Sequence, residues 1–262
     1  MRCLVTILFL IAMRTLAAAP TTLSDDALLK IRFDQKIGAQ VSPDLVFHDE
    51  KGNPVRIGNY FGKRPIVLIA GYYGCPMLCS LVLNGATESF RGLKDTVGQQ
   101  FDVIFVSIDP AETSQLAAEK KKNYLRAYGR PGSDSGWHFL VGDSATIQRF
   151  ADEIGYRFAY DPATRQFAHP SGFIVLTSAG KITRYFSGIT FSASDLDITL
   201  HDAAAGKTET SSQSVPLLCF QYSPSKYGKA VMAAVRITSG VTVLALGALL
   251  VTLPRRKPGR RP

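Results

Sequence analysis

The chain has 262 residues, of which 46% are hydrophobic, and it carries a formal net charge of +9 at pH 7. This length suits one core domain with terminal appendages better than two full domains. Seven of the positive charges lie in residues 1–19 and 254–262, which leaves about +2 for the rest of the chain and no basic stripe. We therefore expect no nucleic-acid partner.

Residues 1–19 have the layout of a secretory signal peptide. Arg2 precedes an apolar run at residues 4–13, and three alanines follow at 17–19. A charged start, a short apolar stretch and small residues before the cleavage site are typical of such leaders. We expect residues 20–205 to form the exported core domain.

Hydrophobic periodicity along the core predicts alternating strands and helices. The expected strands are 41–48, 55–57, 66–70, 101–109, 137–141, 173–176 and 182–186. The expected helices are 78–93, 114–128, one that Ser144 caps and that runs through 154, and one that begins at Ser192 or Ser194. This order predicts an α/β fold of the thioredoxin type with an added hairpin.

Two cysteines, Cys75 and Cys79, stand four residues apart directly after the apolar run 66–70. The start of the next helix should favour thiolate over thiol at this position. The pair could form a local disulfide, act as a redox couple, or supply two ligands of a metal site. Thiolate ligands prefer soft ions such as Cu(I).

A metal site needs a third ligand, and the best placed of the four histidines is His169. It lies in "FAHPSG", which we expect to be a loop just before the strand 173–176, next to the cysteine-bearing strand. The alternative is a solvated loop histidine without a role. The other three, His48, His138 and His201, are less suitable by position.

Four stretches make the chain resemble the SCO/SenC family of membrane-anchored copper proteins: "DEKGNPVRIGNYFGKRPIVLI", "GYYGCPMLC", "VSIDP" and "FAHPSGFIVLTSAGKITRYFSGI". The resemblance implies a thioredoxin-like fold and a copper ion bound by Cys75, Cys79 and His169. It also implies a partner, the subunit of cytochrome c oxidase that receives copper in its binuclear centre, and a thiol reductant.

Three further residues near the cysteines are possible supporting groups. Asp109, in "VSIDP", should end a central strand at the same edge of the sheet; it either supports the site or makes a turn. Tyr72 and Tyr73 either line the site or pack in the core. Cys219, outside the core domain, is either a thiol without a role or a resolving or partner-linking cysteine.

The C-terminal part predicts a membrane anchor. Residues 206–229 read as a polar linker and juxtamembrane segment, 230–253 as one transmembrane helix, and 254–262 as a basic tail. Basic flanks stay cytoplasmic. We expect a protein anchored in a bacterial-type inner membrane, with its main domain in the periplasm.

Two functions follow from these patterns. The first is a non-enzymatic copper chaperone for the oxidase, which explains why His169 accompanies the cysteines. The second is an enzyme, a periplasmic thiol-disulfide reductase that keeps the cysteines of the oxidase reduced.

Overall fold

The computed structural model describes residues 23–75, 78–208, 218–219, 238, 240 and 242, with backbone only at 25, 78–79 and 218–219. The chain divides into two compact units, Ala19–Gln221 on the one hand and Met1–Ala18 with Tyr222–Pro262 on the other. The predicted signal peptide and basic tail lie outside the described residues, as do most of the linker and of the predicted transmembrane helix. Within the described part, no helix combines the length and hydropathy needed to cross a membrane.

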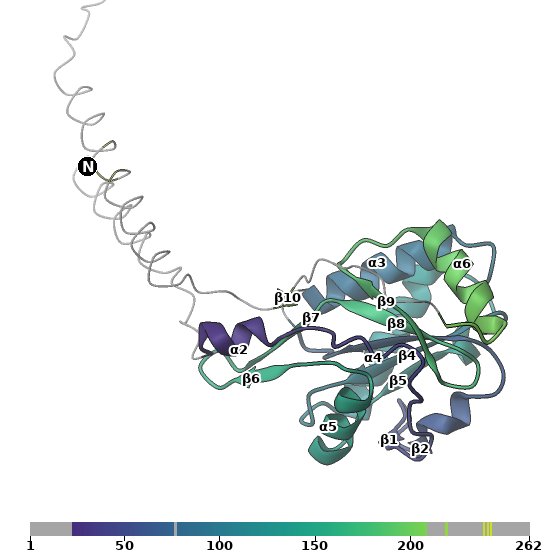
Figure 1. Cartoon of the computed structure of the whole chain (residues 1–262), viewed down its shortest axis with the longest axis horizontal. Helices are drawn as coiled ribbons and strands as arrows, with labels where there is room; N and C mark the ends of the chain where they lie inside the picture. The colour runs from purple at the N-terminus through teal and green to yellow at the C-terminus, as the bar shows by residue number, and fades with distance from the viewer. Residues whose placement is uncertain are drawn as a thin grey trace, which may run out of the picture. The chain divides into compact units, whose positions relative to one another are not determined.

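A five-stranded sheet forms the centre of the larger unit (Figure 1). Its strand order is β5-β4-β3-β8-β9. The strands are β3 (Ile66–Gly71), β4 (Asp102–Ser107), β5 (Trp137–Leu140), β8 (Gly172–Leu176) and β9 (Ile182–Ser187). Strands β3, β4 and β5 are parallel, whereas β8 runs antiparallel to both β3 and β9. This mixed α/β arrangement is consistent with the predicted thioredoxin-like fold.

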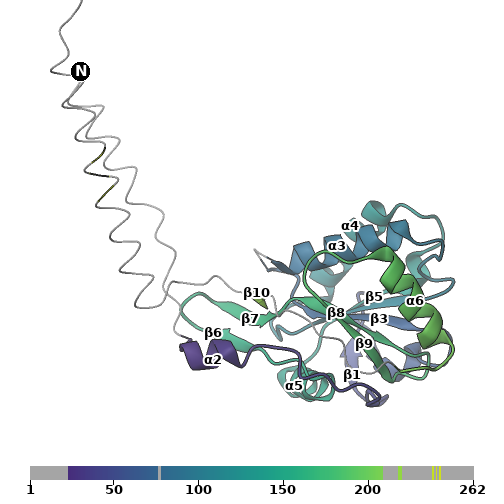
Figure 2. The same ribbon diagram turned by 45° about the horizontal axis from the view of Figure 1, so that its top comes forward.

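Helices cover both faces of this sheet, which explains why β3 and β4 are buried along their whole length. The helices are α3 (Leu78–Gly92), α4 (Ser114–Tyr128), α5 (Ser144–Glu153) and α6 (Ala193–Ala204). Figures 1 and 2 show α3 and α6 on one side of the sheet and α5 on the other. The loop after β3 therefore leaves the sheet at its edge, between the helices of the two faces.

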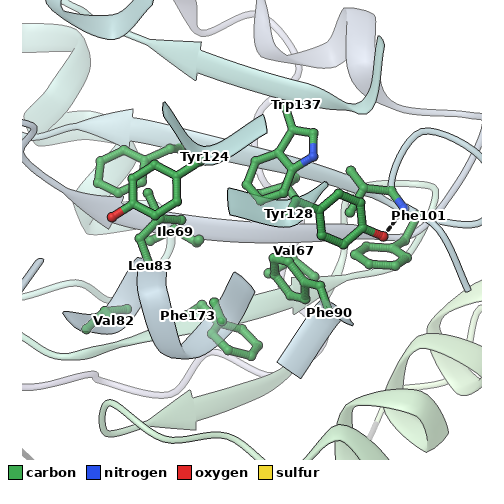
Figure 3. Close-up of a cluster of buried hydrophobic side chains, with 14 of the residues drawn as sticks. Val67, Ile69, Val82, Leu83, Phe90, Phe101, Tyr124, Tyr128, Trp137 and Phe173 are labelled. Atoms are coloured by element: carbon green, nitrogen blue, oxygen red, sulfur yellow. Dashed lines mark hydrogen bonds between the residues drawn. The ribbon is translucent and has the colours of Figure 1, made fainter. Parts of the chain in front are cut away.

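Alternate residues of β3 enter two separate hydrophobic clusters. Val67 and Ile69 pack with α3, α4 and α6, in a cluster rich in aromatic rings (Figure 3). In the same cluster the backbone N–H of Val97 donates to the hydroxyl of Tyr128 at 3.1 Å. The intervening residues of β3 face the second cluster, which contains α5, Tyr72 and Cys75.

Capping groups define where the helices begin. Thr113 caps α4 and Ser192 caps α6, which decides between the two predicted starts, Ser192 and Ser194. The expectation that Ser144 caps α5 was wrong, because the side chain of Asp143 accepts the hydrogen bond from Thr146 N at 2.7 Å. Ser144 is instead the first residue of the helix, since the cap lies one position earlier.

The predicted N-terminal hairpin is present but shorter than expected. Strand β1 (Val46–His48) pairs with β2 (Pro54–Arg56), while Val41 bonds to the loop carbonyl of Gly180 instead of joining a strand. The remaining short elements are α2 (Asp25–Leu29), η1 (Ile57–Tyr60) and η2 (Asp134–Gly136).

A second, three-stranded sheet was not expected from the sequence. Strands β6 (Ala159–Asp161), β7 (Gln166–Pro170) and β10 (Leu218–Cys219) form it in the order β10-β7-β6. The prediction that "FAHPSG" forms a loop is wrong for all but Ser171, because its first four residues belong to β7 and Gly172 begins β8. Pairing on both sides supplies hydrogen bonds that the sequence pattern of β7 did not reveal.

Candidate metal centre

The first predicted ligand lies in the turn between β3 and α3. Cys75 follows the end of β3 by four residues and is only 7% exposed. Cys79 lies in the first turn of the described helix, so the two cysteines flank its N-terminus as predicted. Unpaired N–H groups at this end of a helix stabilise thiolates.

Glu112 holds the backbone of this turn. Its two carboxylate oxygens accept the N–H groups of Tyr73 at 2.8 Å and of Gly74 at 2.5 Å. The hydroxyl of Ser107, at the end of β4, donates to the same carboxylate at 2.6 Å. Burial raises the pKa of Glu112 above its usual value. Glu112 thus ties the segment before Cys75 to the end of β4. Nothing in the local sequence pointed to this role.

His169 is buried beside this turn. Its side chain is 1% exposed, which excludes the alternative of a solvated loop histidine. Its ring meets that of Tyr72 edge to face, with ring centres 5.8 Å apart. Tyr72 is three residues before Cys75, and its ring both contacts the predicted histidine and packs in the buried cluster that contains Cys75. The fold thus brings the predicted histidine to the cysteine turn although 94 positions separate His169 from Cys75 in the sequence.

The hydrogen bonds of His169 determine which ring nitrogen can bind a metal. Its Nδ1 lies 2.7 Å from the hydroxyl of Tyr156 and 2.9 Å from the carbonyl oxygen of Pro170. Because a carbonyl oxygen only accepts hydrogen bonds, we assign the proton of the neutral ring to Nδ1. The lone pair then lies on Nε2, which fits a metal-binding imidazole with its other nitrogen hydrogen-bonded.

The other two residues predicted to support the site, Tyr73 and Asp109, do not direct their side-chain hydrogen bonds to the cysteine turn. The ring of Tyr73 packs on the opposite face of the sheet, where its hydroxyl donates to the carbonyl of Leu140 at 2.8 Å. The carboxylate of Asp109 accepts the N–H of Ala111 at 2.9 Å, which is the role of a turn residue. In the hydrogen bonds of the described residues, Glu112 is the acidic group that contacts the cysteine turn.

The other histidines lie on other elements. His48 is exposed on β1, and His138, on β5, packs against Tyr60 with ring centres 4.1 Å apart and the rings tilted by 37°. His201 lies on α6 with Asp95 and Asp197 close enough to share an ion. That group is partly exposed and offers two carboxylates, which suit harder ions than copper.

Cys219 lies closer to the site than its place in the sequence suggests. The backbone of β10 pairs with β7 so that Cys219 is directly opposite His169. Experiments on the other two cysteines therefore need Cys219 to be controlled.

Comparison with known proteins gives a consistent result. A protein of Aquifex aeolicus VF5, provisionally named as an electron transfer protein, is 26% identical; the match covers 65% of this chain and 95% of that one, with a TM-score of 0.56. Yeast Sco1 with copper bound is 17% identical, with a TM-score of 0.50 and coverage of 66% and 91%, which supports the fold alone.

A curated relative from Stutzerimonas stutzeri, provisionally named as a copper-binding protein, is 25% identical over 122 residues. The match covers 47% of this chain and 54% of the relative, so the chain spans about half the length of that protein. The SCO1/SenC family model matches residues 34–202, well over half of the chain and the whole of the site described above. The chain therefore belongs to the SCO1/SenC family.

Proposed function

We propose that this protein binds a copper ion through Cys75, Cys79 and His169 and delivers it to the binuclear copper centre of cytochrome c oxidase. One observation carries the proposal: a buried imidazole, with Nδ1 hydrogen-bonded, lies beside the turn that bears Cys75. Two thiolates and one neutral imidazole are a donor set that suits copper. The family and the curated relative named as a copper-binding protein support the same choice of metal.

The protein's own residues would prepare the site in three ways. Glu112 fixes the turn before Cys75, Tyr72 shields one side of His169, and Tyr156 holds the imidazole. The low exposure of Cys75 and His169 limits access of water and oxidants to the ligands. Copper transfer then requires a partner that approaches the exposed side of the turn, at Gly74.

The competing function is a thiol-disulfide reductase. In that reaction the dithiol of Cys75 and Cys79 would give two electrons and two protons to a disulfide of the oxidase subunit and would itself become a disulfide. A thiol reductant would restore the dithiol. The reductase reaction gives no reason for a buried, hydrogen-bonded His169, which is why we favour the chaperone.

Copper uptake by the two redox states distinguishes these functions. The full chain, with Cys219 replaced by serine, is prepared fully reduced and fully oxidised and is titrated with Cu(I) under anaerobic conditions. The chaperone predicts one copper per reduced chain and almost none per oxidised chain, because a metal binds thiolates and not a disulfide. Equal uptake in both states would exclude the cysteines as ligands.

We also propose that the core domain is periplasmic and is anchored by residues 230–253, with residues 254–262 in the cytoplasm. The support comes from the leader-like segment 1–19 and from the basic flank. Reporter fusions after Leu253 test this topology. A reporter that is active in the periplasm at this position would overturn it.

A further inference from the structure

The hydroxyl of Tyr156 connects two parts of the site that are far apart in the sequence. It lies 2.7 Å from Nδ1 of His169, on β7, and it donates to the carbonyl oxygen of Ala70, on β3, at 2.9 Å. Ala70 is five residues before Cys75. One buried hydroxyl thus touches both the histidine and the strand that leads to the cysteine turn.

The available protons determine the direction of these bonds. The carbonyl oxygens of Ala70 and Pro170 can only accept hydrogen bonds. The Tyr156 hydroxyl lies 2.9 Å from the Ala70 oxygen and 3.2 Å from the Pro170 oxygen, and Nδ1 of His169 lies 2.9 Å from the Pro170 oxygen, so each proton has a carbonyl at 2.9 Å. With the proton on Nδ1, the ring donates to Pro170 and Tyr156, while Tyr156 donates to Ala70. With the proton on Nε2, the lone pair of Nδ1 would face the Pro170 oxygen at 2.9 Å, which is unfavourable.

Packing fixes the tyrosine ring so that its hydroxyl has one position. Tyr156 is 2% exposed, and its ring meets Phe33 edge to face at 5.6 Å between centres. The ring also stacks against His169, at 5.9 Å and an interplanar angle of 25°. Such a buried and crowded ring cannot follow a rotating imidazole, so it restrains that imidazole instead.

We propose that Tyr156 is the positioning residue for His169. Its hydroxyl accepts a hydrogen bond from Nδ1 and donates one to the carbonyl oxygen of Ala70, which fixes the imidazole ring in the orientation in which Nε2 can bind the metal. The local sequence around Tyr156 gives no sign of this role. The metal-binding part of this inference rests on the proposed function, whereas the tautomer of His169 does not.

The test uses Tyr156→Phe in the full chain, which keeps the ring and removes the hydroxyl. The matched control is Tyr185→Phe: that ring packs on the same Phe33, and its hydroxyl bonds Ile154 and Lys36 instead of the histidine. Competition with a chromophoric Cu(I) chelator measures the affinity. We expect a loss of about tenfold for Tyr156→Phe, as for other groups that orient a metal ligand, and less than about twofold for the control.

Repeating Tyr156→Phe in a chain that lacks His169 distinguishes a positioning role from a general structural role. Combined with His169→Ala, Tyr156→Phe should cause no further loss of copper affinity, because there is no imidazole left to orient. An equal loss in both backgrounds would mean that Tyr156 acts through Ala70 on the cysteine turn, and would overturn the proposal. So would an affinity unchanged by Tyr156→Phe in the wild-type background.

A measurement without metal keeps this inference apart from the proposed function. Nitrogen-15 NMR of the copper-free chain should show His169 with its proton on Nδ1, and Tyr156→Phe should shift those signals while Tyr185→Phe leaves them in place. Unshifted signals in Tyr156→Phe would refute the positioning role. If the signals shift but the wild-type chain binds no copper, the proposed function fails and the positioning of His169 stands.

Discussion

Glu112 accepts the backbone N–H of Tyr73 at 2.8 Å and so anchors the turn that carries Cys75. The other carboxylate oxygen accepts the N–H of Gly74. An amide in place of the carboxylate offers a single acceptor oxygen. Glu112→Gln should therefore leave one of these N–H groups without its partner and lower the free energy of unfolding by about 1–2 kcal/mol.

The control for this prediction is Glu119→Gln, which makes the same change of charge at an exposed position of α4. Urea unfolding of both variants gives the comparison. We expect a shift of less than about 0.5 kcal/mol in the control. Equal stabilities of the two variants would show that Glu112 does not hold the turn.

Burial gives His138 a pH-dependent effect on stability. Its pKa is lowered to about 4, mainly by burial and also by the charge of Lys121. A depressed pKa in the folded state means that the unfolded chain binds the proton more readily. The contribution of neutral His138 to the free energy of unfolding is therefore fully present above about pH 6.5. It is lost as the pH falls toward 4, by up to about 3 kcal/mol.

His138→Phe keeps an aromatic ring against Tyr60 and removes the titrating group. Urea unfolding between pH 7 and pH 4 should show a smaller loss for this variant than for the wild-type chain, and His201→Gln, at an exposed position, should behave like the wild type. Parallel pH profiles for the wild type and His138→Phe would contradict the assignment.

The glycine before Tyr156 controls the approach of this residue to the site. Gly155 has a φ of +63°, and a Cβ there would collide with the carbonyl oxygen of Asp34. Gly132 has a φ of +75° with open space around it, so it provides the matched control. Gly132→Ala should cost about 1 kcal/mol from the backbone conformation alone.

Gly155→Ala should cost at least about 2 kcal/mol, because the collision adds to the same conformational strain. It should also weaken copper binding, since Tyr156 is the next residue and would have to move. Thermal unfolding and the chelator competition measure the two effects. A Gly155→Ala chain as stable as Gly132→Ala would show that the backbone relaxes without cost.

The centre of the sheet was predictable because β3 is a continuous apolar run and β4 holds another between Asp102 and Ser107. Strand β7 was not predictable, since "QFAHP" ends in proline, a residue typical of loops, and its pairing partners stabilise it from outside the segment. The local sequence could not show those partners, and the register of β10 opposite His169 was equally hidden.

The proposed ligands could be named from the sequence because cysteine spacing and a rare residue type carry their own signal. The residues that support the site, Glu112 and Tyr156, have no such signal in the sequence. Glu112 reads as an ordinary acidic residue before a helix, and Tyr156 as one of several aromatic residues in "IGYRFAY". Their roles arise from contacts with Gly74 and His169, which only the folded chain brings within hydrogen-bond distance.

The most direct test of the account is the copper coordination of the reduced full chain with and without His169. X-ray absorption of the wild-type protein should show one copper per chain with two sulfur ligands and one imidazole nitrogen. The exposed His48 serves as control, so His48→Ala should leave the spectrum unchanged. We predict that His169→Ala loses the imidazole contribution and binds copper more weakly by at least about tenfold. An unchanged spectrum and affinity in His169→Ala would contradict the proposed site.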